Sequence, residues 1–123
     1  MVSIPSRHSV GETLDRLEGL VKEKGMTVFA RINFTRDAEH AGLSMQQAEL
    51  LIFGNPRVGT PIMVDRPTVA IDLPLKALAW EDRNGEVRLS YNDPGYLGRR
   101  HGLDSVLVES IRGVALLLQK AAE

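Results

Sequence analysis

Residues 75–91 read Leu-Lys-Ala-Leu-Ala-Trp-Glu-Asp-Arg-Asn-Gly-Glu-Val-Arg-Leu-Ser-Tyr, two largely apolar stretches separated by a polar loop. The loop contains Asn84-Gly85, and this pair is the strongest short signal for a hairpin, because both central positions of a type I′ turn need a positive φ. The segment therefore predicts two antiparallel strands, over residues 75–82 and 87–91, joined by a two-residue turn at Asn84-Gly85.

Upstream of this hairpin, the sequence predicts a helix that begins at Ser9. Ser9 and Glu12 form a capping box, in which each side chain accepts a hydrogen bond from a free backbone amide. Apolar residues then follow at helical spacing over residues 10–21, which places them on one face. Gly25 supplies the left-handed residue that commonly ends a helix.

Three further strands are predicted before the hairpin. Residues 1–6 form a short first strand. Residues 26–34 alternate, so that Val28, Ala30, Ile32 and Phe34 share one face and the residues between them share the other. Residues 50–53, Leu-Leu-Ile-Phe, show no polar alternation, which is typical of a strand that is buried on both faces.

Helical segments follow two of these strands and close the chain. Thr60-Pro61 predicts a helix start, with threonine as the N-cap, and Gly102 is expected to close a helical turn over residues 96–101. The last helix starts near Asp104 and has more apolar residues than one core stripe needs, because Leu116 and Leu117 fall outside that stripe. Hairpins with helices at either end indicate one α+β domain over residues 1–123, an antiparallel sheet with the first and last helices packed on it.

The composition excludes several classes of function. Fifteen basic and sixteen acidic residues give a net charge of −1, which argues against nucleic-acid binding by clustered positive charge. The chain has no cysteine and its three histidines lack the spacing of metal ligands, so we expect no metal and no cofactor. Without an apolar stretch of about 18 residues or a signal-peptide pattern, we expect no membrane association and a cytoplasmic location.

Four segments carry a family resemblance: MTVFARIN (26–33), LLIFGNPRVGTP (50–61), IDLPLK (71–76) and YNDPGY (91–96). Together they resemble the bacterial uncharacterised family called domain of unknown function 302, over about residues 9–120. The resemblance implies a β-α-β(4)-α arrangement similar to the TATA-binding-protein-like fold class, and a homodimer. It implies no DNA binding, because a fold does not carry a function. Many relatives have Asp-His where this chain has Asn33-Phe34, so any role of that histidine is lost here.

Several polar residues lie at the junctions between apolar segments and proline-containing turns, and these polar residues are the candidate site residues. Turns that are set by proline hold neighbouring side chains rigidly. We therefore predict that four of them converge in space, with Asp93 and His101 near the rim: Asn55, Asp72, Lys76 and Tyr91.

Each candidate also has a structural interpretation. Arg57 and the turn amides near Thr60 contain the elements of an anion site, or form a simple strand-to-helix turn. Asp72 and Lys76 lie in an apolar stretch and form either a salt bridge or a polar site pair. Asp93 and His101 suit acid–base chemistry in principle, whereas Asp93 is otherwise a helix cap.

Three functions remain compatible with these residues. The leading hypothesis is a small dimeric binding or regulatory module with a polar pocket for a small anionic or polar ligand. The first alternative is an enzyme that uses Asp72 and Lys76 or Asp93 and His101, although no complete catalytic constellation is visible. The second alternative is an interaction domain without a small-molecule site.

Overall fold

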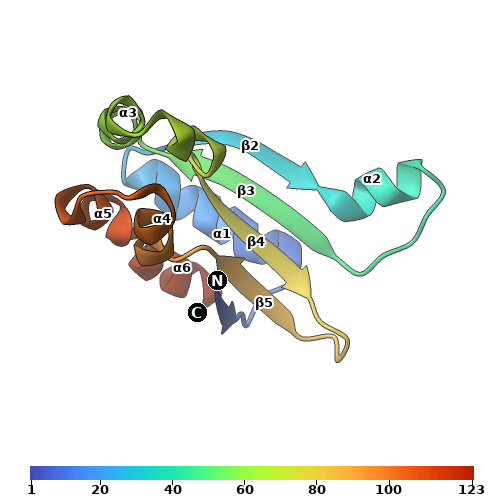
Figure 1. The fold of residues 1–123 in the computed structure, drawn as a ribbon. Coiled ribbons are helices and arrows are strands. Elements are labelled where there is room, and N and C mark those ends of the chain that lie inside the picture. Colours follow the sequence, from blue (N-terminus) through green and yellow to red (C-terminus); the bar gives the residue numbers. More distant parts are fainter.

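The computed structural model describes residues 1–123 and places one five-stranded sheet at the centre of the molecule (Figure 1). The elements follow in the order β1 (Val2–Pro5), α1 (Val10–Glu23), β2 (Thr27–Asn33), α2 (Phe34–His40), β3 (Ala48–Gly54), α3 (Pro56–Asp65), the 3₁₀ helix η1 (Pro67–Ile71), β4 (Leu75–Glu81), β5 (Val87–Tyr91), α4 (Pro94–His101), α5 (Ser105–Arg112) and α6 (Val114–Ala122). The predicted α+β class is confirmed.

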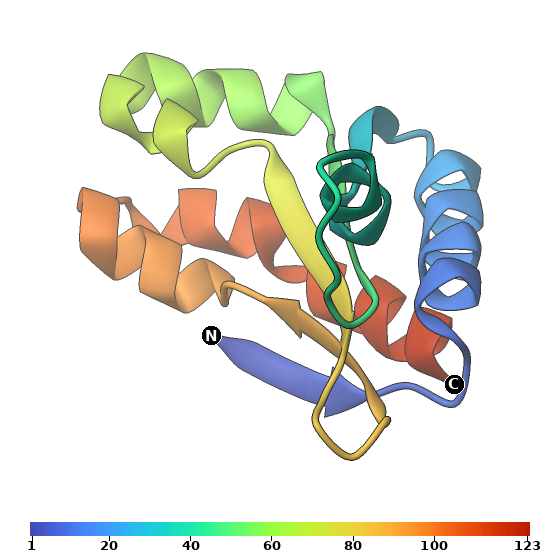
Figure 2. The same cartoon turned by 90° about the vertical axis from the view of Figure 1, so that its right-hand side faces the viewer.

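The strands lie in the order β1-β5-β4-β3-β2, and every neighbouring pair is antiparallel. Helices α1 and α6 cover one face of the sheet, as a view from the side shows (Figure 2). The first and last helices therefore pack on the sheet, as the sequence predicts.

The core lies between this sheet and these two helices. Leu14 and Leu17 of α1, Leu51 and Phe53 of β3, and Leu118 of α6 have no exposed surface. The two β3 residues in this core are two positions apart, because successive residues of a strand point to opposite faces of the sheet. Leu51 and Phe53 therefore point toward the helices, and Leu50 and Ile52 point away from them.

Local capping signals place three helix ends where the sequence predicts them. The hydroxyl of Ser9 accepts from the backbone N–H of Glu12 at 3.1 Å, and the carboxylate of Asp104 accepts from that of Val106 at 2.8 Å. Gly102 ends α4 in the left-handed conformation, with φ 65°. These signals lie within three residues of the helix ends that they define.

An ion-pair network fastens α1 to the sheet through Arg31 of β2. Its Nε lies 3.1 Å from Oε1 of Glu49, which is only 9% exposed. Its Nη1 lies 2.6 Å from Oδ1 of Asp15, and its Nη2 donates to the carbonyl of Gly11 at 3.0 Å. Burial alone lowers the pKa of Arg31, but hydrogen bonds and negative charge from Asp15 and Glu49 raise it above its ordinary value. The guanidinium therefore compensates the buried Glu49.

The regular alternation predicted for residues 26–34 is wrong. Val28 pairs with Phe53 whereas Ala30 pairs with Ile52, so that a β-bulge interrupts the register at Phe29. One extra residue changes the face on which all later side chains point. Val28 therefore packs against the core, while Ala30 points to the opposite face of the sheet.

The hairpin between β4 and β5 is confirmed, but its two-residue type I′ turn is wrong. Within the loop only Gly85 has a positive φ, at 79°, whereas a type I′ turn also needs a positive φ at Asn84. The N–H of Gly85 donates to the carbonyl of Asp82, and the N–H of Asp82 donates to the carbonyl of Glu86. The Asp82 carboxylate accepts from the amides of Asn84 and Glu86, and these bonds lower its pKa. Because Asp82 closes the loop, a three-residue connection replaces the shorter turn.

Two helix boundaries also differ from the predictions. Helix α3 begins at Pro56 with Asn55 as its N-cap, so Thr60 is not a cap and Pro61 lies inside the helix. In both Asn55-Pro56 and Thr60-Pro61, a residue suited to the N-cap is followed by a proline suited to the first helical position. Asn55-Pro56 comes first along the chain. The terminal helix is divided into α5 and α6 at Gly113.

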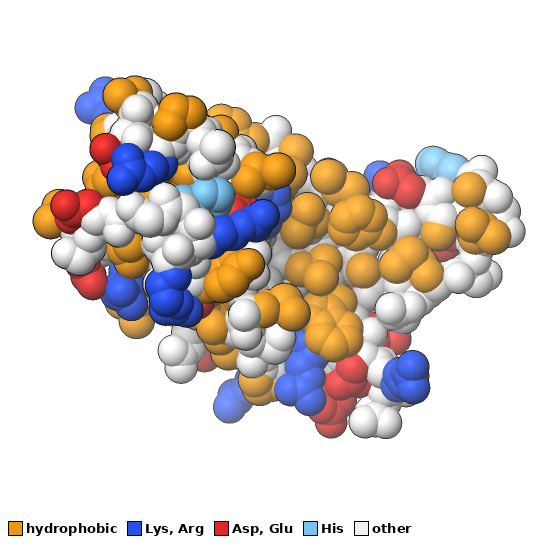
Figure 3. Space-filling view, viewed as in Figure 1, with side chains coloured by type: hydrophobic (Ala, Val, Ile, Leu, Met, Phe, Trp, Pro, Cys, Tyr) orange, Lys and Arg blue, Asp and Glu red, His pale blue; other side chains and the backbone are white.

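The sheet face opposite α1 and α6, here called the open face, carries no helix layer (Figure 1). The register of β2, β3 and β4 places six half-buried apolar side chains on it: Ala30, Ile32, Leu50, Ile52, Leu78 and Trp80. Figure 3 shows hydrophobic side chains gathered over these strands. In an antiparallel sheet with one face open to solvent, that face usually carries polar side chains. The apolar character of this open face is therefore unusual.

Candidate functional site

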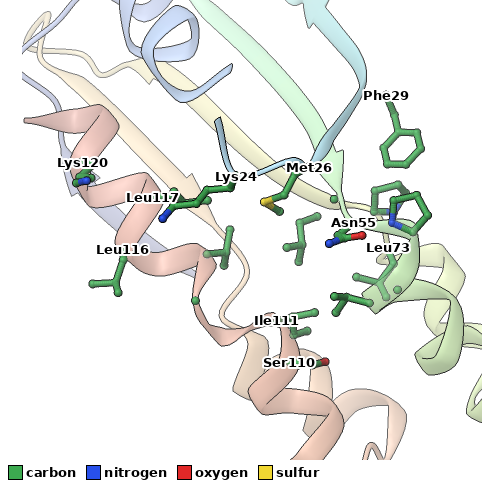
Figure 4. A pocket seen from close by; sticks show the side chains of 18 of the residues that line it. Lys24, Met26, Phe29, Asn55, Leu73, Ser110, Ile111, Leu116, Leu117 and Lys120 are labelled. Carbon is green, nitrogen blue, oxygen red and sulfur yellow. The ribbon is translucent and has the colours of Figure 1, made fainter. Parts of the chain in front are cut away.

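A cavity of about 660 Å³ opens where β3 ends and β2 begins, between α3 and the junction of α5 with α6 (Figure 4). Its walls come from segments that are far apart in sequence, including the ends of α1 and β3, the first turns of α3, and Leu73 to Leu75. The volume lies within the range of about 300–1,000 Å³ that is usual for small-molecule sites. The cavity is therefore large enough to hold a ligand.

The cavity is lined mainly by apolar side chains. Met26, Val58, Leu73, Ile111 and Leu117 contribute from five different segments. Figure 4 shows Met26, Leu73, Ile111 and Leu117 around a common space. This chemistry differs from the polar pocket that the sequence predicts.

A small number of polar groups border these apolar walls. The side-chain oxygen of Asn55 accepts from the N–H of Arg57 at 3.0 Å, which leaves its amide nitrogen as a free donor on the cavity side (Figure 4). Lys24 and Lys120 also line the cavity, and both are exposed. An apolar cavity with a few polar groups is the usual composition of a binding site.

Asp72 and His101 meet at a second place, where η1 ends beside the last turn of α4. Oδ2 of Asp72 lies 2.5 Å from Nε2 of His101, and both Asp72 oxygens lie 3.1 Å from Nη1 of Arg100. Nδ1 of His101 lies 3.5 Å from the hydroxyl of Thr68. The His101 side chain is 6% exposed and that of Asp72 is 12% exposed. None of these four residues lines the cavity.

Lys76 does not join Asp72, and the salt bridge considered for this pair is absent. Lys76 lies on the open face opposite Ile52, and its ammonium donates to the carbonyl of Pro74 at 3.3 Å. Asp72 precedes β4 and is engaged by α4. The three residues between them turn the chain from η1 into β4, so the two charged side chains point to different surroundings.

Tyr91 and Asp93 form a third group at the end of β5. Burial raises the pKa of Tyr91, and the negative charge of Asp93 raises it further. Asp93 stands at the N-cap of α4 without a side-chain capping bond. Tyr91 packs against the core, which makes it part of the structure on the helix side of the sheet.

The predicted convergence of Asn55, Asp72, Lys76 and Tyr91 is therefore not seen. Asn55 borders the cavity, Asp72 contacts His101, and Lys76 lies on the open face. Arg57 is exposed near the start of α3 and does not line the cavity. Helix α3 begins at Pro56, so the helix N-terminus that was expected at Thr60 lies instead beside Arg57.

The sequence interpretation missed the residues that form the cavity walls. Met26, Ile111 and Leu117 have the same apolar character as core residues, so no motif distinguishes them. One signal was present, namely the surplus of apolar residues in the terminal helix. Leu116 and Leu117 both line the cavity, and Leu116 is 72% exposed.

Two further observations concern metals and membranes. No group of three or more His, Cys, Asp or Glu side chains is arranged to hold a metal ion. None of the helices has both the length and the apolar character needed to cross a membrane.

Comparisons with known proteins give relatives of two kinds. The chain is 43% identical over 126 aligned positions to "Fluoride-specific ion channel FluC 1" of Brucella suis biovar 1 (strain 1330), covering 99% of this chain and 50% of that protein. It is also 43% identical to "Fluoride-specific ion channel FluC 1" of Brucella abortus biovar 1 (strain 9-941), covering 99% and 47% respectively. The chain thus spans about half the length of these curated relatives.

A solved structure shares the fold. It is that of an uncharacterized conserved protein DUF302 from Bacillus stearothermophilus, with a TM-score of 0.80 and 21% identity, covering 98% of this chain and 94% of the other. At this identity the likeness concerns the fold alone. The family model described as "Domain of unknown function DUF302" matches residues 2–121. The chain belongs to the DUF302 family.

Proposed function

We propose that this domain is a binding module for a small, largely apolar molecule, and that the molecule binds in the cavity between α3 and α6. The observation that carries this proposal is the cavity itself, with its volume of about 660 Å³ and its mainly apolar walls. Burial of apolar ligand surface contributes about 25 cal/mol per Å². Asn55 adds a fixed hydrogen-bond donor that orients a polar group.

The position of the ionisable groups supports binding over catalysis. A catalytic acid or base must lie within hydrogen-bond reach of its substrate. Asp72 and His101 contact each other but do not line the cavity, and Tyr91 and Asp93 do not line it either. The residues of the enzyme alternatives therefore lie outside the space that we propose as the binding site.

A neutral fluorescent probe tests the cavity. Nile red should bind the unmodified chain with one site and gain fluorescence. Val58→Trp adds a large side chain at the cavity wall and should weaken this binding at least tenfold. Val64→Trp, in the same helix but 77% exposed and outside the cavity, is the matched control and should bind as the unmodified chain does. Equal binding by all three proteins would show that the probe does not occupy the cavity.

We also propose that the domain forms a homodimer through the open face. A contiguous apolar patch on a protein surface usually marks an interaction site, and symmetric pairs are the commonest oligomers. Ile52 and Leu78 lie near the middle of this face. A second copy would cover their half-buried side chains with an identical surface.

Light scattering at micromolar concentration tests the dimer. The unmodified chain should have about twice the 13.6 kDa mass of one chain. Leu78→Lys should give monomers, because it places a charge in the apolar interface. Val106→Lys, on an exposed residue of α5, should leave the mass unchanged. A monomeric unmodified chain would contradict the proposal.

The fluoride-channel relatives suggest a physiological setting. We propose that the region they share with this chain is accessory to transport and tunes the channel through ligand binding. Deletion of this chain's coding region should change growth in millimolar fluoride, and restoration of the chain should reverse the change. Growth that is independent of the chain at every fluoride concentration would refute this role.

A further inference from the structure

The charges at the cavity are the basis for a sharper inference, which rests on the proposed binding function. Lys24, at the C-terminal end of α1, reaches across toward Leu117 of α6, and Lys120 lies one turn further along α6 (Figure 4). Both lysines therefore stand on the α6 side of the cavity. Glu123 is the single acidic residue that lines it.

Neither lysine has its charge neutralised within the chain. Lys22, two residues before Lys24, pairs with Glu18 at 3.2 Å. The ammonium groups of Lys24 and Lys120 have no carboxylate within 4.0 Å. Two free positive charges thus stand beside an apolar space, which complements a molecule that has one anionic end and an apolar body.

We infer that the ligand is an amphipathic monocarboxylate. Its carboxylate lies between Lys24 and Lys120, and its alkyl or aromatic body lies against Met26, Ile111 and Leu117. The apolar body provides most of the affinity, since each buried methylene tightens binding by up to about fourfold. An exposed ammonium–carboxylate pair contributes a factor of up to about five, so two such pairs provide selectivity.

Three probes with unbranched alkyl chains of about the same length and different head groups test the inference: decanoate, decanol and decyltrimethylammonium. Displacement of Nile red gives the Kd of each. Decanoate should bind the unmodified chain about ten times more tightly than decanol, and decyltrimethylammonium should bind most weakly. Octanoate should bind more weakly than decanoate, by up to about 15-fold for the two methylenes removed.

Charge-removing variants locate the head group. The double variant Lys24→Gln, Lys120→Gln should weaken decanoate binding about tenfold and leave decanol binding unchanged. Lys22→Gln removes a lysine that does not line the cavity and should leave both Kd values unchanged, which makes it the matched control. Thermal melts should show that all variants remain folded.

The outcomes separate this inference from the binding function on which it rests. If decanoate and decanol bind the unmodified chain equally, or if the double variant retains full preference for decanoate, the monocarboxylate inference is overturned. The binding function survives that result as long as Val58→Trp still blocks Nile red. If Nile red and all three probes fail to bind, both the inference and the binding function are overturned.

Discussion

Replacing Gly98 with alanine tests the close packing of α4 against α5. Gly98 is buried inside α4, and a Cβ added there would lie 2.5 Å from Cγ2 of Val108 and 3.7 Å from its Cβ. Carbon atoms pack best at about 3.5–4.0 Å. Val108 is 7% exposed, and valine in a helix strongly prefers one χ1 rotamer, so its methyl group cannot turn aside freely.

The expected change in stability follows from two opposing effects. Glycine to alanine inside a helix stabilises by about 1 kcal/mol, whereas an overpacked methyl group destabilises by about 1–3 kcal/mol. Gly98→Ala should therefore lower the free energy of unfolding by about 1 kcal/mol. Gly19→Ala is the control, because Gly19 lies inside α1 with no atom within 4 Å of the added Cβ. It should raise the free energy of unfolding by about 0.5–1 kcal/mol.

Urea denaturation of four variants and the unmodified chain measures the effect. Besides the two single variants, the series includes Val108→Ala and the double variant Gly98→Ala, Val108→Ala. The loss of unfolding free energy in the double variant should be smaller, by about 1–2 kcal/mol, than the sum of the losses in Gly98→Ala and Val108→Ala. The reason is that alanine at position 108 leaves room for the new methyl group. If Gly98→Ala stabilises as much as Gly19→Ala, the reasoning about this contact is refuted.

Three further changes test other parts of the structure by thermal or urea unfolding. Arg31→Met should destabilise by about 2–3 kcal/mol because it leaves the buried Glu49 charge unpaired, and adding Glu49→Gln should recover part of the loss; an unchanged midpoint in the single variant would contradict the network. Lys76→Met should change stability by less than about 0.5 kcal/mol because Lys76 has no charged partner. Asp72→Asn should cost about 1–2 kcal/mol because it weakens charged hydrogen bonds. A larger loss in Lys76→Met than in Asp72→Asn would contradict this separation of the two residues. Gly85→Val should cost about 1–2 kcal/mol, since a β-branched residue resists a positive φ, and a stability equal to that of the unmodified chain would exclude the observed turn.

The sequence predicted features whose determinants lie close together along the chain. The cap at Ser9 and the left-handed end at Gly102 each depend on side chains and backbone groups within a few residues. The antiparallel hairpin at Asn84-Gly85 has the same local origin. These features, together with the periodicity of α1, were sufficient to predict the α+β class.

Predictions failed where two local choices had similar energies or where a register changed. Asn55-Pro56 and Thr60-Pro61 offer the same capping chemistry, and the earlier one starts α3. The bulge at Phe29 cannot be recognised from the alternating sequence, because alternation alone does not show where the pairing of β2 with β3 shifts by one residue. In both cases the local sequence allows two outcomes, and only the folded structure shows which one forms.

The candidate site shows the same division. Asp72 and His101 were both candidate residues, and their contact joins positions 29 residues apart in sequence. This contact depends on the packing of η1 beside α4, which local sequence patterns do not predict. Lys76, only four residues from Asp72, lies elsewhere because strand alternation directs it to the open face.

By itself, the sequence determined the helix caps at Ser9 and Asp104, the β4–β5 hairpin and the α+β class, since each arises from interactions between near neighbours. Only the tertiary structure decided that Lys24, Met26, Ile111 and Leu117 border one cavity. Those residues come from α1, the start of β2, α5 and α6, and their side chains are ordinary core or surface types. A cavity is space left between packed elements, so its existence depends on their relative positions and not on the identity of any single residue.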